Sequence, residues 1–373
     1  MSINVEQRYE TARDVSRNNK VPAIILETSG ECPLACKRCY MITGDRTASL
    51  SGKPQMIDSR KAVEIFDLIK AQNSGQEAQS VDLVGGEPML PRVWQEVKKT
   101  IEIASDRGIV PWLFTNGMFM TPEDAKWLLD KKTFITMKLN IGNPNDPKQM
   151  ELQAKMVGRN INAAKQLARG LYIALDAGLK NPQLSVENLI RAENAPLVGE
   201  FYELGLKLGF KPDVEITGNG QKDNWGFFAE APSIEQIRSI MGQIKSVREK
   251  QGLEPITFLM PHITGSCSFF DTALYFRPNG DIQPCSGNPT VLANVNQENA
   301  IGNAIESPVI QVRRNLTQSQ LSGPCGNCGT WSLCRGGCRA TVESFGNPYG
   351  SYPLCGIQKE FNNAKDIALS NKK

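Results

Sequence analysis

Short apolar runs alternate with longer segments in which apolar residues recur every three or four positions. The short runs predict buried strands, and the longer periodic segments predict helices with one buried face. Strands are expected at 22–26, 80–84, 110–115, 133–140, 171–175, 214–217 and 256–259. Helices are expected between them at 59–72, 91–107, 121–130, 148–169, 194–208 and 233–250.

This regular alternation of strands and helices predicts the fold class. Strands that are separated by helices form parallel sheets with helical crossovers. About six such units favour an α/β fold of the partial (β/α)6 TIM-like barrel type over a complete eightfold barrel.

The composition changes after residue 260, where cysteine, glycine and proline become frequent and helical periodicity fades. A small region with little apolar surface is usually held together by metals or covalent bridges. We therefore expect a polar N-terminal segment at 1–20, a core domain at 21–260 and a small Cys-rich domain at 261–373. A polar helix is expected to close the chain from residue 357.

Charge and composition exclude several classes of protein. The 373 residues carry a net charge of +3, which gives no argument for binding nucleic acid or an anionic membrane. The start is polar and no apolar run is long enough to span a bilayer, so a cytoplasmic protein is expected. Disulfides are disfavoured in that compartment, so the ten cysteines indicate metal or redox chemistry. The single histidine, His262, leaves sulfur as the main metal ligand.

Three cysteines follow the first predicted strand as Cys32-x3-Cys36-x2-Cys39. Three thiolates would bind three irons of a four-iron cluster and leave the fourth iron free for a substrate or cofactor. The alternatives are a structural zinc site or free thiols. Zinc needs a fourth ligand, but no further cysteine occurs before Cys267.

This spacing, with Tyr40 directly after it, resembles the radical SAM superfamily. Gly85-Gly86-Glu87-Pro88 after the second predicted strand agrees with the resemblance. It implies that the open iron chelates S-adenosylmethionine and that the 85–88 loop holds the methionine amine. The position before the third cysteine is Arg38 where the family usually has an aromatic residue, so the adenine of the cofactor is expected to be seated differently.

Further polar residues end the predicted strands and are candidates for binding the ribose, the carboxylate or the substrate. The alternative is that they only cap turns. These residues are Thr115, Asn116, Gly117, Lys138, Asn140 and Asp176.

The seven later cysteines resemble the SPASM extension of radical SAM enzymes along its whole length. The resemblance implies two auxiliary [4Fe-4S] clusters, and hence three clusters in the chain. The distal ligands would be Cys325, Cys328, Cys334 and Cys355, and the proximal ligands Cys267, Cys285 and Cys338. The proximal fourth position would be open or filled by Asp271, His262 or the substrate. A zinc ribbon is the alternative, although seven cysteines fit four-sulfur zinc sites poorly.

The resemblance implies a radical SAM oxidoreductase with Cys32, Cys36 and Cys39 as its catalytic residues. S-adenosylmethionine would be cleaved reductively, and the 5′-deoxyadenosyl radical would remove hydrogen from an unactivated carbon. The electron donor would be of the flavodoxin or ferredoxin type. Every cysteine is assigned to a cluster, so no thiol is left to return a hydrogen atom. Net oxidation through the auxiliary clusters is therefore expected rather than epimerisation.

The substrate is the least constrained part of the interpretation. Only about twenty polar residues precede the first predicted strand, so no leader-peptide-binding module is expected there. Ser286 stands where sulfatase-maturing relatives carry an acidic base. We therefore expect a small polar metabolite of the sugar or aminocyclitol type. The alternatives are a ribosomal peptide or protein side chain, or a non-catalytic electron-transfer or scaffold protein.

Overall fold

The computed structural model describes residues 18–36, 39, 41, 56–216, 230–264, 267 and 272–357. One sheet runs through the molecule in the order β6-β5-β4-β3-β2-β1-β7-β8-β9. All neighbours from β6 to β7 are parallel, and β8 and β9 continue the sheet antiparallel. The strands are β1 (Ala23–Glu27), β2 (Ser80–Val84), β3 (Val110–Thr115), β4 (Phe134–Lys138), β5 (Leu184–Ile190), β6 (Lys211–Ile216), β7 (Ala273–Phe276), β8 (Asp281–Gln283) and β9 (Ala293–Asn294).

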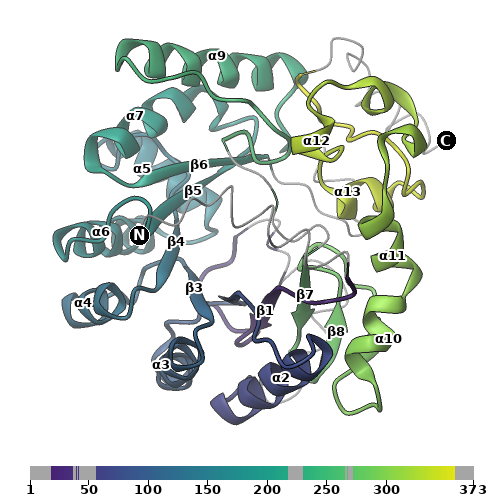
Figure 1. Cartoon of the computed structure of the whole chain (residues 1–373). Coiled ribbons are helices and arrows are strands. Elements are labelled where there is room, and N and C mark those ends of the chain that lie inside the picture. The colour runs from purple at the N-terminus through teal and green to yellow at the C-terminus, as the bar shows by residue number, and fades with distance from the viewer. Residues whose placement is uncertain are drawn as a thin grey trace.

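Helices cover the outside of the curved sheet, and the C-terminal elements lie across from α4 and α6 (Figure 1). This is the partial α/β barrel that the alternating pattern predicts. The principal helices are α2 (Ser59–Gln72), α3 (Pro91–Asp106), α4 (Pro122–Asp130), α5 (Pro147–Met156), α6 (Ile161–Asp176), α7 (Val198–Leu208), α9 (Ile234–Lys250), α10 (Ala300–Glu306), α11 (Pro308–Asn315), α12 (Trp331–Cys334) and α13 (Arg339–Ser344).

The central strands are buried on both faces, as expected for a parallel sheet. Ile24 and Val81 belong to the large core under the helices. Their neighbours Ile25, Val84 and Tyr275 form a separate apolar cluster on the opposite, inner face. The continuous apolar runs in the sequence therefore reflect two cores, one on each side of the sheet.

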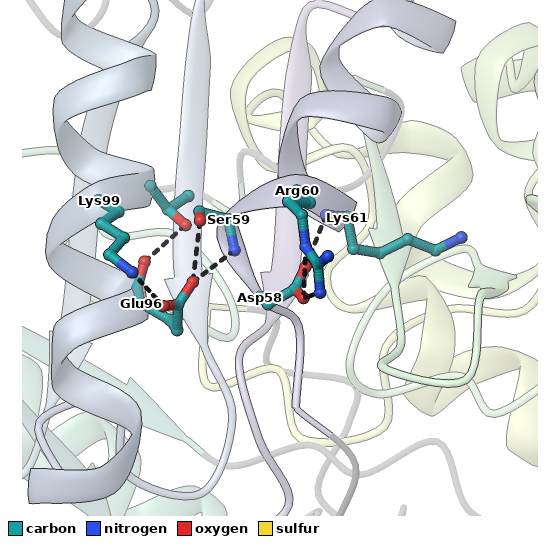
Figure 2. A network of polar contacts seen from close by, with 7 residues as sticks. Asp58, Ser59, Arg60, Lys61, Glu96 and Lys99 are labelled. Carbon is teal, nitrogen blue, oxygen red and sulfur yellow. Dashed lines mark hydrogen bonds and ion pairs between the residues drawn. The ribbon is translucent and has the colours of Figure 1, made fainter.

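Glu96 of α3 fixes the N-terminus of α2 (Figure 2). Its carboxylate accepts hydrogen bonds from the backbone N–H and hydroxyl of Ser59 at 2.9 and 2.8 Å, and from Lys99 Nζ at 2.6 Å. Asp58 caps α2 by accepting from Lys61 N at 2.9 Å. The hydrogen bond from Lys99 and those from Ser59 lower the pKa of Glu96 to about 2. Two neighbouring helices are thus held in register by one ionised carboxylate.

The structure corrects the sequence prediction around residue 171. Residues 171–175 belong to helix α6, because Leu167, Leu171 and Ala174 continue its buried face at helical spacing. The fifth strand is instead β5. The helix expected at 148–169 is two helices, α5 and α6.

The C-terminal region also differs from expectation. Residues 256–259, all described, form no strand. β7 pairs in parallel with β1, with Ile24 opposite Leu274, so the sheet continues past the predicted boundary near 260. The polar segment to residue 17 and the helix expected beyond residue 357 lie outside the described residues. Among the described helices, none is long and apolar enough to cross a membrane.

Candidate functional site

The first cysteine loop directly follows β1 and packs tightly on the turn between α5 and α6. Ala35 N donates to Val157 O at 3.0 Å, and Leu34 packs with Val157 in an apolar cluster. Gly158 has φ +63°, and a Cβ there would lie 2.1 Å from Ala35 O. Only glycine fits this contact. The break between α5 and α6 therefore allows the turn between them to contact the first cysteine loop closely.

The three thiols of this loop form no disulfide and are partly buried. Burial raises the pKa of Cys32 to about 12 and that of Cys36 to about 11, and the nearby Cys39 thiol raises the pKa of both further. Cys39 N donates to Cys36 O at 3.1 Å, which holds the second and third cysteines of the motif close together. The thiolates needed as ligands would thus be stabilised by a bound metal.

Within the described ranges, no three Cys, His, Asp or Glu side chains are arranged to hold a single metal ion. A four-iron cluster presents its irons at separate corners, so its cysteines need not converge on one point. Three thiols without disulfides in one short segment have the donor chemistry that such a cluster requires. The arrangement does not resemble a mononuclear zinc site.

The two glycines after β2 serve a close contact within the chain. Gly86 N donates to Ser29 O at 2.7 Å, and a Cβ on Gly86 would lie 1.9 Å from Glu31 O. Gly85 has φ +133°, and a Cβ on it would lie 2.5 Å from Ser29 O. The close approach expected for a ligand is therefore made first by the segment leading into the cysteine loop.

Glu87 is almost completely buried, with 1% of its surface exposed. Its carboxylate accepts from the Thr115 hydroxyl at 2.5 Å, from Asn116 N at 2.8 Å and from Met89 N at 2.9 Å. Burial still raises its pKa to about 7. Glu87 thus joins the loop after β2 to the loop after β3.

Asn116 faces the first cysteine loop. Its Oδ1 accepts from Met118 N at 2.9 Å, which orients the amide, and its Nδ2 lies 3.8 Å from Cys32 Sγ as a hydrogen-bond donor. Gly117 has φ +78° and closes the turn after β3. These residues lie together at the carboxyl ends of the strands, as the sequence predicts.

The remaining candidates from the sequence fall into different places. Asn140 makes contacts within the chain: its Oδ1 accepts from Leu189 N at 3.0 Å and its carbonyl accepts from Asn194 Nδ2 at 3.0 Å. Asp176 is the exposed last residue of α6, so its assignment to the strand ends is wrong. The error follows from the misassigned strand at 171–175. Tyr40 lies outside the described residues.

Lys138 belongs to a charged cluster on the inner faces of β4, β5 and β6. It forms an ion pair with Glu187, whose carboxyl is hydrogen bonded to that of Glu215. Glu215 Oε1 lies 3.8 Å from His262 Nε2, and the His262 side chain is hydrogen bonded to Cys267. We call these four side chains the inner charged cluster: Lys138, Glu187, Glu215 and His262.

The pKa values of the two carboxyls of this cluster are shifted in opposite directions. Burial disfavours ionisation of Glu187, but Lys138 and the hydrogen bond from Glu215 outweigh it and hold its pKa below the usual range. Burial and the adjacent Glu187 raise the pKa of Glu215 well above normal. The pair therefore shares one proton.

Sequence reasoning missed both carboxylates. The signal was present, because Asp213 and Glu215 alternate with apolar residues along β6 and must share one face. Glu187 is a charged residue buried in a strand, β5, that is buried along most of its length. Polar residues at alternate positions of a buried strand indicate an inner surface that is not a packed core.

The C-terminal cysteines also form no disulfide, and Cys325 and Cys355 are buried. Buried hydrogen-bond donors around them have no partner among the described residues: Tyr352 OH, Trp331 Nε1 and Arg339 Nε. Buried polar groups are rarely left unpaired. Tyr352 and Arg339 both lie in electrostatic range of Cys334 and Cys338.

These unpaired buried donors near the cysteines would be satisfied by a bound group that carries many hydrogen-bond acceptors. The sulfides and thiolates of an iron–sulfur cluster accept hydrogen bonds. The residues of this region therefore fit auxiliary iron–sulfur clusters.

Comparison with known proteins agrees with this geometry. Residues 26–194 match the family model of the Radical SAM superfamily. The chain is 23% identical over 349 residues to mycofactocin maturase MftC of Mycolicibacterium smegmatis, covering 88% of this chain and 81% of that protein. It is 22% identical over 366 residues to AdoMet-dependent heme synthase of Nitratidesulfovibrio vulgaris, covering 89% and 91%.

Two further proteins are similar. PqqA peptide cyclase of Rhizobium meliloti is 22% identical over 372 residues, covering 95% of this chain and 92% of that protein. The crystal structure of Streptococcus suis SuiB bound to precursor peptide SuiA superposes with a TM-score of 0.63 and 15% identity, covering 95% of this chain and 82% of that one.

Proposed function

We propose that this chain, whose residues 26–194 match the Radical SAM superfamily, is an enzyme that modifies a side chain of a ribosomal peptide. The cofactors of such domains are a [4Fe-4S] cluster and S-adenosylmethionine. When bound, they supply a carbon radical that removes a hydrogen atom from an unactivated carbon. The observation that carries the proposal is the set of Cys32, Cys36 and Cys39 after β1, with the Asn116 amide directed at Cys32.

We assign a role to each residue around this loop from its position in the structure. Cys32, Cys36 and Cys39 would ligate the cluster. The loop from Gly85 to Pro88 would hold the amine of S-adenosylmethionine, with Glu87 keeping that loop fixed against Asn116. A rigid, largely buried frame suits this task, because the protein's part is to bind, orient and exclude water.

A peptide replaces the small polar metabolite as the proposed substrate. The names of two relatives support it: PqqA peptide cyclase and SuiB bound to a precursor peptide. Mycofactocin maturase is consistent with a modifying enzyme of this kind. The names of these proteins give no such support to a substrate of the sugar or aminocyclitol type.

The substrate side chain would lie over the inner faces of β4 to β6. Lys138 and Arg191 are near enough to Cys36 to lower its pKa electrostatically, whereas His262 contacts Cys267. The inner charged cluster thus extends between the first cysteine loop and the C-terminal cysteines. Lys138 remains 40% exposed, so a ligand can reach it.

Net oxidation remains the proposed reaction type. None of the ten cysteines forms a disulfide in the structure and all are assigned as cluster ligands, so none is reserved as a hydrogen donor. Oxidation removes an electron after the hydrogen atom, and the C-terminal clusters would accept it.

The experiment is a peptide library incubated with the reconstituted enzyme, S-adenosylmethionine and dithionite. Release of 5′-deoxyadenosine together with a peptide that has lost the mass of two hydrogen atoms is expected. Glu215→Gln should reduce peptide modification more than cleavage without peptide, whereas the exposed Asp176→Asn should change neither. Cleavage without modification of any peptide, but with oxidation of a small metabolite, would contradict the peptide assignment.

A further inference from the structure

Arg313 of α11 is one of the most deeply buried charged residues in the described chain, with 1% of its surface exposed. Its Nε and Nη2 donate to the two carboxylate oxygens of Glu343 on α13 at 2.9 and 2.7 Å. Glu343 is held in turn by Asn288 Nδ2 at 2.8 Å. This paired contact fixes the plane of the guanidinium.

The remaining arm of the guanidinium is directed at a cysteine. Arg313 Nη1 donates to Cys285 Sγ at 3.6 Å. Cys338, which is partly buried, lies in electrostatic range of both Cys285 and Arg313. Two of the three cysteines assigned to the proximal cluster therefore lie beside one immobile positive charge.

Glu343 balances the charge of Arg313 but does not use all of its hydrogen-bond donors. The carboxylate accepts only from Nε and Nη2, so the Cys285 sulfur is the acceptor of Nη1 among the described residues. A neutral thiol sulfur is a weak acceptor. An iron–sulfur cluster bound through Cys285 and Cys338 carries thiolates and sulfides, which would be stronger acceptors for this donor.

We propose that Arg313 is a positioning residue that donates a hydrogen bond to the Cys285 thiolate and raises the reduction potential of the proximal auxiliary cluster. A nearby positive charge stabilises the reduced, more negative form of a cluster, and hydrogen bonds to the ligand sulfurs act in the same direction. The inference rests on the proposed function, because it takes the C-terminal cysteines as cluster ligands. It adds that the protein makes this cluster a better electron acceptor.

The test is a potentiometric titration of the auxiliary clusters followed by electron paramagnetic resonance. The full chain with Cys32, Cys36 and Cys39 replaced by Ala serves as the parent, because it retains only the C-terminal cluster sites. Arg313→Gln should lower the equilibrium constant for one-electron reduction about tenfold, a shift of about 59 mV to lower potential. Arg313→Lys keeps the charge but loses the paired contact with Glu343, so a smaller shift in the same direction is expected.

Arg314 provides the matched control. It is the next residue of α11 and is also buried, but its Nη2 donates to the backbone carbonyl of Lys20 at 2.9 Å. Arg314→Gln should leave the potential unchanged. A structural role alone for Arg313 would alter stability without moving the potential.

An unchanged potential in Arg313→Gln at parental iron content would overturn the inference and leave the proposed function intact. If Arg313→Gln binds less iron than the parent, Arg313→Lys decides: a downward shift supports the inference and an unchanged potential overturns it. A parent that binds no iron after reconstitution would overturn the assignment of the C-terminal cysteines, and the inference with it.

Discussion

The backbone N–H of Asn116 donates to Oε2 of Glu87 at 2.8 Å, so the loops that follow β2 and β3 are joined by one buried carboxylate. The same Asn116 directs its amide at Cys32. The 85–88 loop and the first cysteine are therefore positioned through a common residue. A change at Glu87 should act on the cofactor site without touching a metal ligand.

Glu87→Ala should destabilise the protein and weaken binding of S-adenosylmethionine. It would leave three donors without an acceptor, from Thr115, Asn116 and Met89. Unsatisfied buried donors cost about 2 kcal/mol in the free energy of unfolding. Urea unfolding and equilibrium binding of S-adenosylmethionine measure the two effects. Glu102→Gln, on the exposed side of α3, should change neither, and normal cofactor affinity in Glu87→Ala would refute the assigned role.

The ion pair between Lys138 and Glu187 predicts coupled effects on stability. Lys138→Met would leave Glu187 beside Glu215 without a positive partner, which should lower the free energy of unfolding by about 1 kcal/mol, since Lys138 is partly exposed. Adding Glu187→Gln should recover most of this loss. A double-mutant cycle by urea unfolding gives the coupling, and strictly additive effects would argue against the pair.

Asp82→Asn should stabilise the protein at neutral and alkaline pH. Asp82 lies on β2 between Ile25 and Trp112, is 6% exposed, and burial raises its pKa to about 8. The folded state thus holds a proton that the unfolded state releases, so wild-type stability should fall as the pH rises from about 4 to about 8.

The asparagine variant should show no such fall at this site. We expect it to be more stable than the wild type by about 2 kcal/mol at pH 8 and nearly equal near pH 4. Unfolding free energies across this range test the prediction. A variant equally destabilised at every pH would show that the carboxyl itself is needed at this position.

Glu96→Gln should destabilise the contact between α2 and α3 in a pH-dependent way. The folded-state pKa of Glu96 is depressed to about 2, so its contribution is present above about pH 4.5 and is lost as the pH falls toward 2. A loss of about 1 kcal/mol is expected at pH 7. Unfolding measured from pH 7 down to pH 3 should show the two proteins converging, and a constant difference would contradict this account.

The sequence predicted the barrel well where strands and helices have distinct lengths. The strands from 22 to 140 and the cysteine loop were found because buried apolar runs and the Cys32-Cys36-Cys39 spacing are local signals. Residues 171–175 misled the prediction, because a short apolar run does not distinguish a strand from the buried face of a helix. The misplaced Asp176 followed directly from that error.

The inner charged cluster could not be assembled from the sequence. Glu187, Glu215 and His262 come from separate segments and meet only through the strand register of β5 and β6 and the pairing of residue 262 with residue 215. The contact between Arg313 and Cys285 likewise depends on how α11 packs beside β8 and α13. A local pattern such as the alternation along β6 marks the face on which a side chain lies, but not the partners that long-range packing brings to it.

The central claim is that this chain cleaves S-adenosylmethionine with a cluster bound by Cys32, Cys36 and Cys39, and that the other cysteines hold two more clusters. The most direct test is the iron and acid-labile sulfide content per chain after anaerobic reconstitution, compared between the wild type and the Cys32/Cys36/Cys39→Ala variant. The account predicts about twelve irons falling to about eight, with loss of 5′-deoxyadenosine formation. About four irons with stoichiometric zinc in the wild type would contradict it and make the C-terminal cysteines structural.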